Sequence, residues 1–316
     1  MLGSAPCAAS RCVRLLRTTD GATTWQARPV PEAVVADHDY PREGSTIRFA
    51  DQRNGWMFGT GLGRRTGLWA THDGGVTWQA STMPVGMVTG PLVLAAAAGT
   101  VHAVVSDDND LLHVVTSPVD KDQWSDTSVT IPAGGGPAPS PRIVLRDDSG
   151  WIVENNPMRA GVFGVPGGAR LVGGRWTTWQ PPCADTAGVW PAATSVDLLA
   201  LCGYAEHGSG QTVLRSADNG STFSAEGQTP GGSSAQGFAE SGDRRVVLAA
   251  GAELLVSTDC CAQWTTAYSS KEDGHFRDLE LTTPTFGVVM QWTSDNGRLL
   301  VTRDGGGSWT TIRFAG

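Results

Sequence analysis

The chain has 316 residues, of which 40% are hydrophobic, so it can bury a sizeable core as one large domain or two ordinary ones. Its 41 glycines and 17% charged residues are typical of many short strands joined by turns rather than of long surface helices. The formal net charge of −8 argues against broad binding to nucleic acid or anionic membranes, and the sequence has no apolar run long enough to span a bilayer.

An eight-residue pattern, [ST]-x-D-x-G-x-[ST]-W, recurs along the chain. Its Asp and its first Ser or Thr can bond to backbone N–H groups within a tight turn, while the Gly takes a positive φ. The closing aromatic begins the next strand and can pack across neighbouring strands. We expect structural rather than catalytic roles for the residues of the five copies, which are Asp20 with Trp25, Asp73 with Trp78, Asp218 with Phe223, Asp259 with Trp264, and Asp304 with Trp309.

Two weaker echoes fill the gaps between these copies. Residues 116–124 keep an acidic turn and a closing Trp124, and residues 173–179 keep the Gly turn and a closing Trp179. Successive closing aromatics are then 53, 46, 55, 44, 41 and 45 residues apart, the spacing of four-stranded propeller blades. The sequence predicts an all-β fold over residues 1–316, a single seven-bladed β-propeller domain whose blades end near residues 29, 82, 130, 181, 226, 268 and 314.

A second signature precedes several of the copies. Residues 49–59 and 145–153 each read as a strand, a polar turn with Asp, and a second strand that begins with Gly-Trp, and residues 281–289 are a looser copy. Alternating β-branched and aromatic residues mark short strands. Each blade is therefore expected to run from an inner strand through a second and a third strand to the turn with Asp and an outer strand.

These residues resemble the Asp-box, or BNR, repeat superfamily of propellers. The D-x-x-x-G-W hairpin followed by the T-x-D-G-G-x-T-W box is most similar to its photosystem II stability and assembly factor-like group. The resemblance covers nearly the whole chain. It implies the fold more than the function, because Asp boxes also occur in sialidases, other glycoside hydrolases and sorting receptors.

The first blade is expected to be incomplete. Leu2-Gly3-Ser4 resembles the end of a second strand, as Phe58-Gly59-Thr60 does in the next blade. Blade one would then lack its innermost strand, and propellers usually close their ring by pairing strands from both termini. We expect upstream residues to have carried that strand together with an export signal or a lipid anchor, or else an imperfect closure at Met1.

Six cysteines form three pairs that are close in the sequence, which favours an oxidising compartment. Their spacing does not fit a zinc site, and buried free thiols are the alternative to disulfides. A vicinal bond would be strained and easily reduced, because adjacent Cα atoms are about 3.8 Å apart, so a structural ring, a redox role and two free thiols all stay open at the last pair. The expected pairs are Cys7 with Cys12, Cys183 with Cys202, and Cys260 with Cys261.

The enzyme alternative is a sialidase-type glycoside hydrolase. Sialidases use three converging arginines, a Tyr–Glu nucleophile pair and an Asp acid/base, and carry an F-R-I-P type motif near the start. Here Ser45-Thr-Ile-Arg48-Phe is the nearest approach and lacks the proline; Tyr268 with Glu272 is the best nucleophile pair. No other catalytic motif, metal site or cofactor site stands out, and Asp107 to Asp110 reads as a solvated hairpin tip rather than a calcium loop.

If the protein binds a partner, the face opposite the Asp boxes is the expected place, because long polar loops gather there on a rigid scaffold. We therefore expect a non-enzymatic, monomeric and extracytoplasmic scaffold without a cofactor, which binds a protein or a glycan; a peptide receptor of the sorting type would differ only in its partner. The candidate binding residues are His38, Asp39, Tyr40, Arg42, Glu154, Asn155, Arg159, Glu206, His207, Tyr268, Lys271, His275 and Trp292.

Overall fold

The computed structural model describes most of the chain, and for some of the described residues it describes only the backbone. In the described part every regular element is a β-strand, as the composition predicts. No helix there is long and apolar enough to cross a membrane. The described residues are 1–7, 10–31, 46–60, 66–84, 93–107, 109, 111–132, 141–154, 158–159, 162–163, 167–183, 189–193, 197–203, 210–232, 235–242, 244–272, 274–293 and 297–312.

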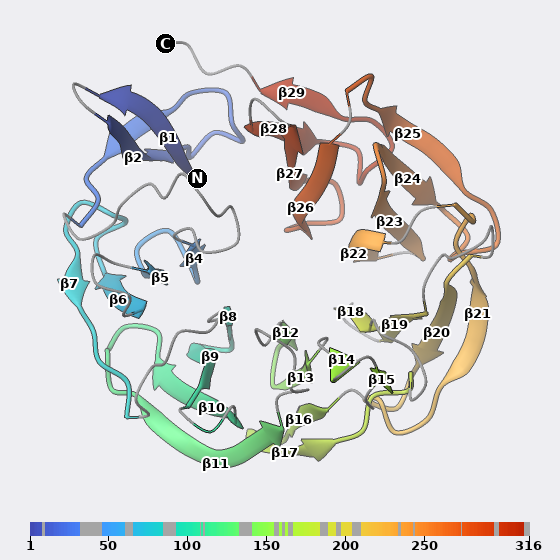
Figure 1. Ribbon diagram of the computed structural model, residues 1–316, viewed down its shortest axis with the longest axis horizontal. Helices are drawn as coiled ribbons and strands as arrows, with labels where there is room; N and C mark the ends of the chain where they lie inside the picture. Colours follow the sequence, from blue (N-terminus) through green and yellow to red (C-terminus); the bar gives the residue numbers. More distant parts are fainter. Residues whose placement is uncertain are drawn as a thin grey trace. The chain divides into compact units, whose positions relative to one another are not determined.

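Six sheets have four antiparallel strands each, and one sheet near the N-terminus has three (Figure 1). The three-stranded sheet consists of β1 (Leu2–Cys7), β2 (Ser10–Arg17) and β3 (Gln26–Arg28). The next three sheets consist of β4 (Thr46–Phe49), β5 (Gly55–Thr60), β6 (Thr66–Thr71) and β7 (Gln79–Ala80); β8 (Val93–Ala97), β9 (Thr100–Ser106), β10 (Leu111–Pro118) and β11 (Ser125–Pro132); and β12 (Pro141–Arg146), β13 (Ser149–Glu154), β16 (Gly168–Val172) and β17 (Arg175–Trp179). The last three consist of β18 (Val189–Ala193), β19 (Leu198–Cys202), β20 (Thr212–Ser216) and β21 (Ser224–Gln228); β22 (Ala235–Gly242), β23 (Arg245–Ala250), β24 (Glu253–Ser257) and β25 (Thr265–Ser269); and β26 (Gly274–Leu281), β27 (Gly287–Thr293), β28 (Gly297–Thr302) and β29 (Thr310–Ile312). Two short strands, β14 (Met158–Arg159) and β15 (Val162–Phe163), lie in the connection between β13 and β16.

Each four-stranded sheet is a meander, so its connections fall at two opposite ends. We call the end with the first–second and third–fourth connections the turn end, and the end with the second–third connection and the link to the next sheet the loop end. The chain divides into two compact units, one carrying β1 to β14 with β16 and β17, the other carrying β15 and β18 to β29. Within the first unit β8 contacts β4 and β12, and within the second β22 contacts β18 and β26. Within each unit, successive sheets thus contact one another through their first strands. This is the arrangement of blades in a β-propeller.

The hydrophobic core of each unit lies between neighbouring blades. One cluster joins Trp56 and Phe58 of the β4–β7 blade to Val101 and Val105 of the β8–β11 blade. Trp56 is fully buried. Burying an indole of this size contributes on the order of 4–6 kcal/mol before the entropy of folding is subtracted. The other clusters repeat this arrangement, so packing between blades holds each unit together.

The predicted D-x-x-x-G-W hairpin is the connection of β4 with β5, and its copy in the connection of β12 with β13 is one residue shorter, D-x-x-G-W. Phe49 pairs with Gly55, and Leu145 pairs with Gly150. The side chain of each large residue folds over its glycine, so that a Cβ on Gly55 would lie 2.6 Å from the Phe49 ring and one on Gly150 would lie 2.5 Å from Leu145. A larger residue at either position would therefore require the Phe49 or Leu145 side chain to move.

Four connections between a third and a fourth strand, and the connection of β2 with β3, are aspartate turns, a name we give to the turns centred on Asp20, Asp73, Asp218, Asp259 and Asp304. In the second of these, the Thr71 and Thr77 hydroxyls donate to the Asp73 carboxylate at 2.8 and 2.6 Å, and the Val76 and Thr77 amides donate to it at 2.9 Å. These bonds, above all the one from the Thr77 side chain, hold the pKa of Asp73 well below its usual range. The bonds from the first hydroxyl and from the later backbone amide recur at the other four positions, and the second hydroxyl bond recurs at Asp20, Asp218 and Asp304 but not at Asp259, where Gln263 replaces the Thr or Ser.

Three closing tryptophans join their blades to the end of the outer strand before them, whereas Trp309 donates to Gly306 in its own turn. In each of the three, the indole Nε1 donates a hydrogen bond to an acceptor at the end of the outer strand of the preceding blade. Packing alone would not fix the angle between two blades, and this hydrogen bond adds direction to it. The donor and acceptor pairs are Trp78 with the Pro29 carbonyl at 3.1 Å, Trp124 with the Ser81 hydroxyl at 3.0 Å, and Trp264 with the Gln228 carbonyl at 2.9 Å.

The β12–β17 blade departs from the predicted pattern. Trp179, the predicted closing aromatic, is the last residue of β17 and pairs with Gly168 at the loop end. Trp176 instead is buried and donates from its Nε1 to the Nδ1 of His102 at 3.0 Å, on a strand of the preceding blade. The reason is the turn, because Gly173 and Gly174 form a two-residue hairpin that is shorter than an aspartate turn and brings an earlier aromatic to the blade contact.

Candidate functional site

An exposed tryptophan lies at the loop end of the last blade. Trp292 pairs with His275 on the neighbouring strand, so the two side chains project from the same side of the sheet. Trp292 is 45% exposed, and its ring atoms lie 3.6 Å from the place that a Cβ on Gly297 would take. The His275 ring is itself exposed, and its Nδ1 lies 3.4 Å from the Gln236 amide nitrogen of the preceding blade.

The strand that carries Trp292 is fixed by contacts of the residue before it, Gln291. Gln291, the residue before Trp292, is fully buried, and the Tyr268 hydroxyl donates to its Oε1 at 3.3 Å. The Tyr268 ring packs edge-on against Phe276, with ring centroids 6.3 Å apart. The Nε2 of Gln291 has no hydrogen-bond partner in the described part of the chain. The tryptophan therefore stands on a rigid strand rather than on a loop.

An ion pair lies at the same loop end, on the other side of the sheet from Trp292, because Arg298 pairs with Gln291. The Arg298 guanidinium donates to the Glu272 carboxylate at 2.7 Å, and both side chains are well exposed. The contact with Glu272 raises the pKa of Arg298, but a pair this exposed contributes little to stability. We call Glu272, His275, Trp292 and Arg298 together the loop-end surface.

The structure does not join the candidate nucleophile pair of a sialidase. The Tyr268 hydroxyl contacts Gln291 and the Glu272 carboxylate contacts Arg298, and no hydrogen bond between Tyr268 and Glu272 occurs among the described residues. Nor do three or more His, Cys, Asp or Glu side chains of the described residues group in a way that could hold a metal ion.

The other predicted binding residues fall into three groups. Lys271 is exposed beside Glu272. Glu154 is the last residue of β13 and is 1% exposed, so it is buried in a sheet and does not stand on a polar loop, because the apolar strand predicted from residue 151 continues through it. The backbone of Arg159 lies in β14, but its side chain is outside the described part, as are His38, Asp39, Tyr40, Arg42, Asn155, Glu206 and His207.

The three cysteine pairs have different outcomes. A disulfide joins Cys183 to Cys202, as predicted. The Cys7 and Cys12 side chains lie outside the described part. Cys260 and Cys261 are both free thiols with their sulfur atoms 3.0 Å apart, which is one of the alternatives that the sequence leaves open.

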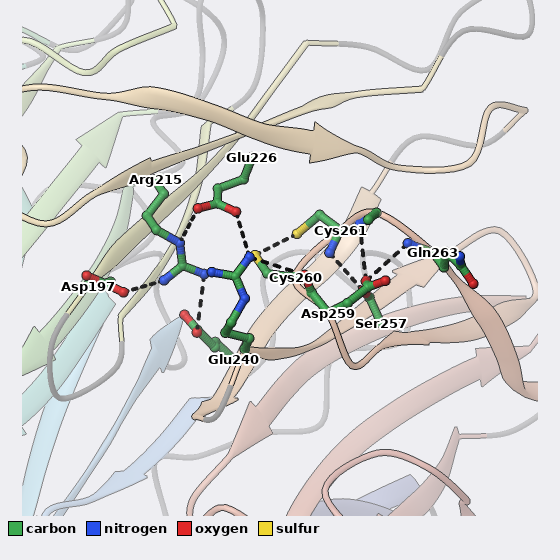
Figure 2. A network of polar contacts seen from close by, with 11 residues as sticks. Asp197, Arg215, Glu226, Glu240, Ser257, Asp259, Cys260, Cys261 and Gln263 are labelled. Carbon is green, nitrogen blue, oxygen red and sulfur yellow. Dashed lines mark hydrogen bonds and ion pairs between the residues drawn. The ribbon is translucent and has the colours of Figure 1, made fainter.

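Sequence reasoning missed a charged network in the second unit (Figure 2). Arg215 on β20 forms ion pairs with Asp197, with Glu226 at 2.9 Å and with Glu240 at 3.9 Å. Arg244 donates to Glu226 at 3.0 Å. The only signal in the sequence was a charged residue inside an apolar strand pattern, such as Arg215 in TVLRS or Glu240 in GFAES.

The network surrounds the free cysteines and changes their titration. Burial raises the pKa of Glu240 to about 7 and outweighs the attraction of Arg215. The Cys261 thiol, with help from Arg215, lowers the pKa of Cys260 to about 7, whereas the pKa of Cys261 is strongly raised by its contact with Cys260 and by burial.

Comparison with known proteins bears on the fold. No family model matches the chain, and no curated protein matches its sequence. Among solved structures the chain is similar to YCF48 from Cyanidioschyzon merolae, with a TM-score of 0.58 and 13% identity over 93% of this chain and 88% of that chain. A YCF48 bound to a D1 peptide has a TM-score of 0.54 and 16% identity over 87% and 85% of the two chains. The GH74 enzyme of Niastella koreensis has a TM-score of 0.51 and 15% identity over 95% of this chain and 61% of that chain. The chain is therefore a β-propeller that resembles YCF48 and a GH74 enzyme in structure.

Proposed function

We propose that this protein is a non-enzymatic propeller that acts as a binding scaffold for an extended segment of a partner protein, and that the segment docks on the loop-end surface. The observation that carries the proposal is the exposure of Trp292 on a strand. A large aromatic that is already held in place loses little conformational entropy when it is covered, and such residues dominate binding energies.

The distribution of exposed apolar side chains supports this location. Four large hydrophobic side chains of the described residues are exposed, and Trp292 is the one at a loop end. Phe49, Val76 and Val172 lie at turn ends. The Phe49 ring also makes contacts within the fold, because it packs edge-on against Trp78 and covers Gly55.

Charged and polar groups at the same loop end supply the directional part of the site. Arg298 can bind a carboxylate or a backbone carbonyl of the partner, and Glu272 and His275 can accept or donate hydrogen bonds. Groups of this kind contribute more to register and specificity than to affinity. A peptide offers backbone donors and acceptors at regular intervals, which suits a surface with one aromatic anchor and several polar groups.

We extend the proposal to the seventh blade, the single monomeric domain and the extracytoplasmic location that the sequence predicts. The three-stranded sheet is counted as a seventh blade, because β2 and β3 are joined by an aspartate turn like the third and fourth strands of the other blades. The whole chain is then one monomeric propeller domain. The Cys183–Cys202 disulfide supports an extracytoplasmic location, and the YCF48 structure with a D1 peptide supports a protein partner.

The test is a selection of peptides from a displayed random library on the purified protein. We expect enriched peptides whose dissociation constant rises at least about tenfold with Trp292→Ala, since anchor residues contribute more than 1.4 kcal/mol. The matched control is Val76→Ala, which removes an equally exposed apolar side chain from a turn end and should leave binding unchanged. Enriched peptides that lose affinity with Val76→Ala but not with Trp292→Ala would contradict the proposed site, and a glycan array that gives the stronger ligands would contradict the proposed partner.

A further inference from the structure

Two adjacent cysteines occupy positions where the fold favours glycine. The central residues of the aspartate turns have positive φ, as Gly74 and Gly75 do with φ of 76° and 84°. Cys260 and Cys261 take the same conformation, with φ of 48° and 82°. A side chain in the left-handed region carries a steric cost that glycine avoids. The chain accepts that cost twice in succession, which points to a use for these side chains.

The surroundings of the pair make its two sulfur atoms unlike each other. Both side chains are buried, their sulfur atoms lie within hydrogen-bond distance at 3.0 Å, and the positive charge of Arg215 acts on Cys260. The contact with Cys261 and the charge of Arg215 lower the pKa of Cys260, whereas the contact with Cys260 and burial raise the pKa of Cys261, so Cys260 is the sulfur that ionises first. One residue is thus prepared as a nucleophile, and the other is held beside it as a proton donor.

The charges around the pair act on this arrangement from several sides. Arg215 is the cation that faces Cys260, and Arg244 reaches the same region, where its guanidinium donates to the Asp259 carbonyl at 3.2 Å. Glu226, Glu240 and Asp197 surround Arg215 (Figure 2). Their negative charge opposes a thiolate, and the two arginines favour it. Arg215 is therefore a positioning residue for the thiolate.

We propose that Cys260 and Cys261 form a peroxide-reactive dithiol that is converted reversibly into a vicinal disulfide. The Cys260 thiolate attacks one oxygen of hydrogen peroxide, the O–O bond breaks, and the leaving hydroxide takes a proton to become water. The Cys261 sulfur then attacks the sulfenic sulfur of Cys260, the S–O bond breaks, and the Cys261 proton leaves with the hydroxide as a second water. Two thiols are oxidised by two electrons and one peroxide is reduced.

The geometry suits the second step, because the two sulfur atoms are already 3.0 Å apart and a bond requires about 2.05 Å. Small rotations of the two side chains supply this approach. A ring between adjacent residues is strained, and strained disulfides are reduced by mild thiols, so the change is expected to be reversible.

The test uses the full-length protein and peptide mass spectrometry. Trypsin cleavage after Arg245 and Lys271 gives the peptide 246–271, which contains Cys260 and Cys261 and no other cysteine. After treatment of the folded protein with hydrogen peroxide at pH 7, we expect this peptide to lose two hydrogen atoms and its capacity for alkylation, and to recover both with dithiothreitol. Recovery of the peptide with both thiols still free, or with Cys260 oxidised further to the sulfinic acid, would overturn the proposal.

Variants separate the two roles while near-ultraviolet circular dichroism checks the fold. Cys260→Ser should slow the reaction at least about tenfold, since the remaining thiol is hardly ionised. Cys261→Ser should leave a sulfenic acid on Cys260 that dimedone traps. Arg215→Gln should move the midpoint of the rate–pH profile to higher pH while the Cys183–Cys202 disulfide stays intact. If Cys260→Ser reacted with hydrogen peroxide as fast as the parent protein, Cys260 would not be the sulfur that attacks peroxide, and the proposal would be contradicted.

Discussion

The buried His102 makes the first unit sensitive to mild acid. Its ring is 6% exposed and packs edge-on against Trp176, with ring centroids 5.6 Å apart. Burial lowers the pKa of His102 to about 4. Its Nδ1 accepts the hydrogen bond from Trp176, and protonation of that nitrogen would remove the acceptor. The folded chain therefore keeps this imidazole neutral at pH values where the unfolded chain binds a proton.

The direction and size of the effect follow from proton linkage. The stabilising effect of keeping His102 neutral is fully present above the unfolded pKa of 6.5 and is lost as the pH falls toward the folded pKa of about 4. Between pH 7 and pH 5 the free energy of unfolding should fall by about 2 kcal/mol through this one group. The Asp carboxylates of the aspartate turns, whose pKa values are lowered, contribute only at more acidic pH.

The assay is urea unfolding at pH 7, 6 and 5, followed by tryptophan fluorescence, on the parent protein and on His102→Asn. Asparagine keeps an acceptor for Trp176 but does not titrate. Its free energy of unfolding should depend less on pH, by about 2 kcal/mol over this range. An identical pH dependence in the two proteins would refute the reasoning, because His102 would then be equally protonated in the folded and unfolded chains.

Three further outcomes are expected. Replacing Cys183 and Cys202 by alanine opens a loop with a sequence separation of 19. This should lower the free energy of unfolding by about 3 kcal/mol and the melting temperature in calorimetry by about 5 °C. An unchanged melting temperature would show that the disulfide does not constrain the unfolded chain. Gly227→Ala should destabilise the protein by about 1–3 kcal/mol in urea unfolding, because its Cβ would overlap the Cys261 carbonyl of the next blade, and a neutral effect would mean that the two blades can separate there freely. A fluorogenic sialoside should not be hydrolysed, and turnover that Tyr268→Phe abolishes would show that the site is catalytic.

The features that sequence predicted best are those that a few adjacent residues determine. An aspartate turn forms within eight residues, so the pattern around Asp73 contains nearly every donor and acceptor that the turn uses. The D-x-x-x-G-W hairpin is equally local, because Phe49 and Gly55 belong to one strand pair. The repeat of such units along the chain then predicts blades.

Contacts between blades were harder to predict, because they join residues that are far apart in the sequence. Trp176 was overlooked in favour of Trp179, since only its partner His102, on another blade, shows which indole faces the contact. The network of Arg215 joins strands of two blades and a turn, and its members are ordinary charged residues when read one at a time. Glu154 was placed on a loop because its charge hid the fact that β13 continues through it.

Hydroxyl-radical footprinting of the protein, with and without a peptide from the library selection, tests the proposed function most directly. The account predicts that bound peptide lowers the modification of Trp292 and His275, while the exposed Val76 at a turn end reacts as before. Unchanged modification of Trp292, with protection at Val76 instead, would show that the partner binds the opposite end of the blades and would contradict the account.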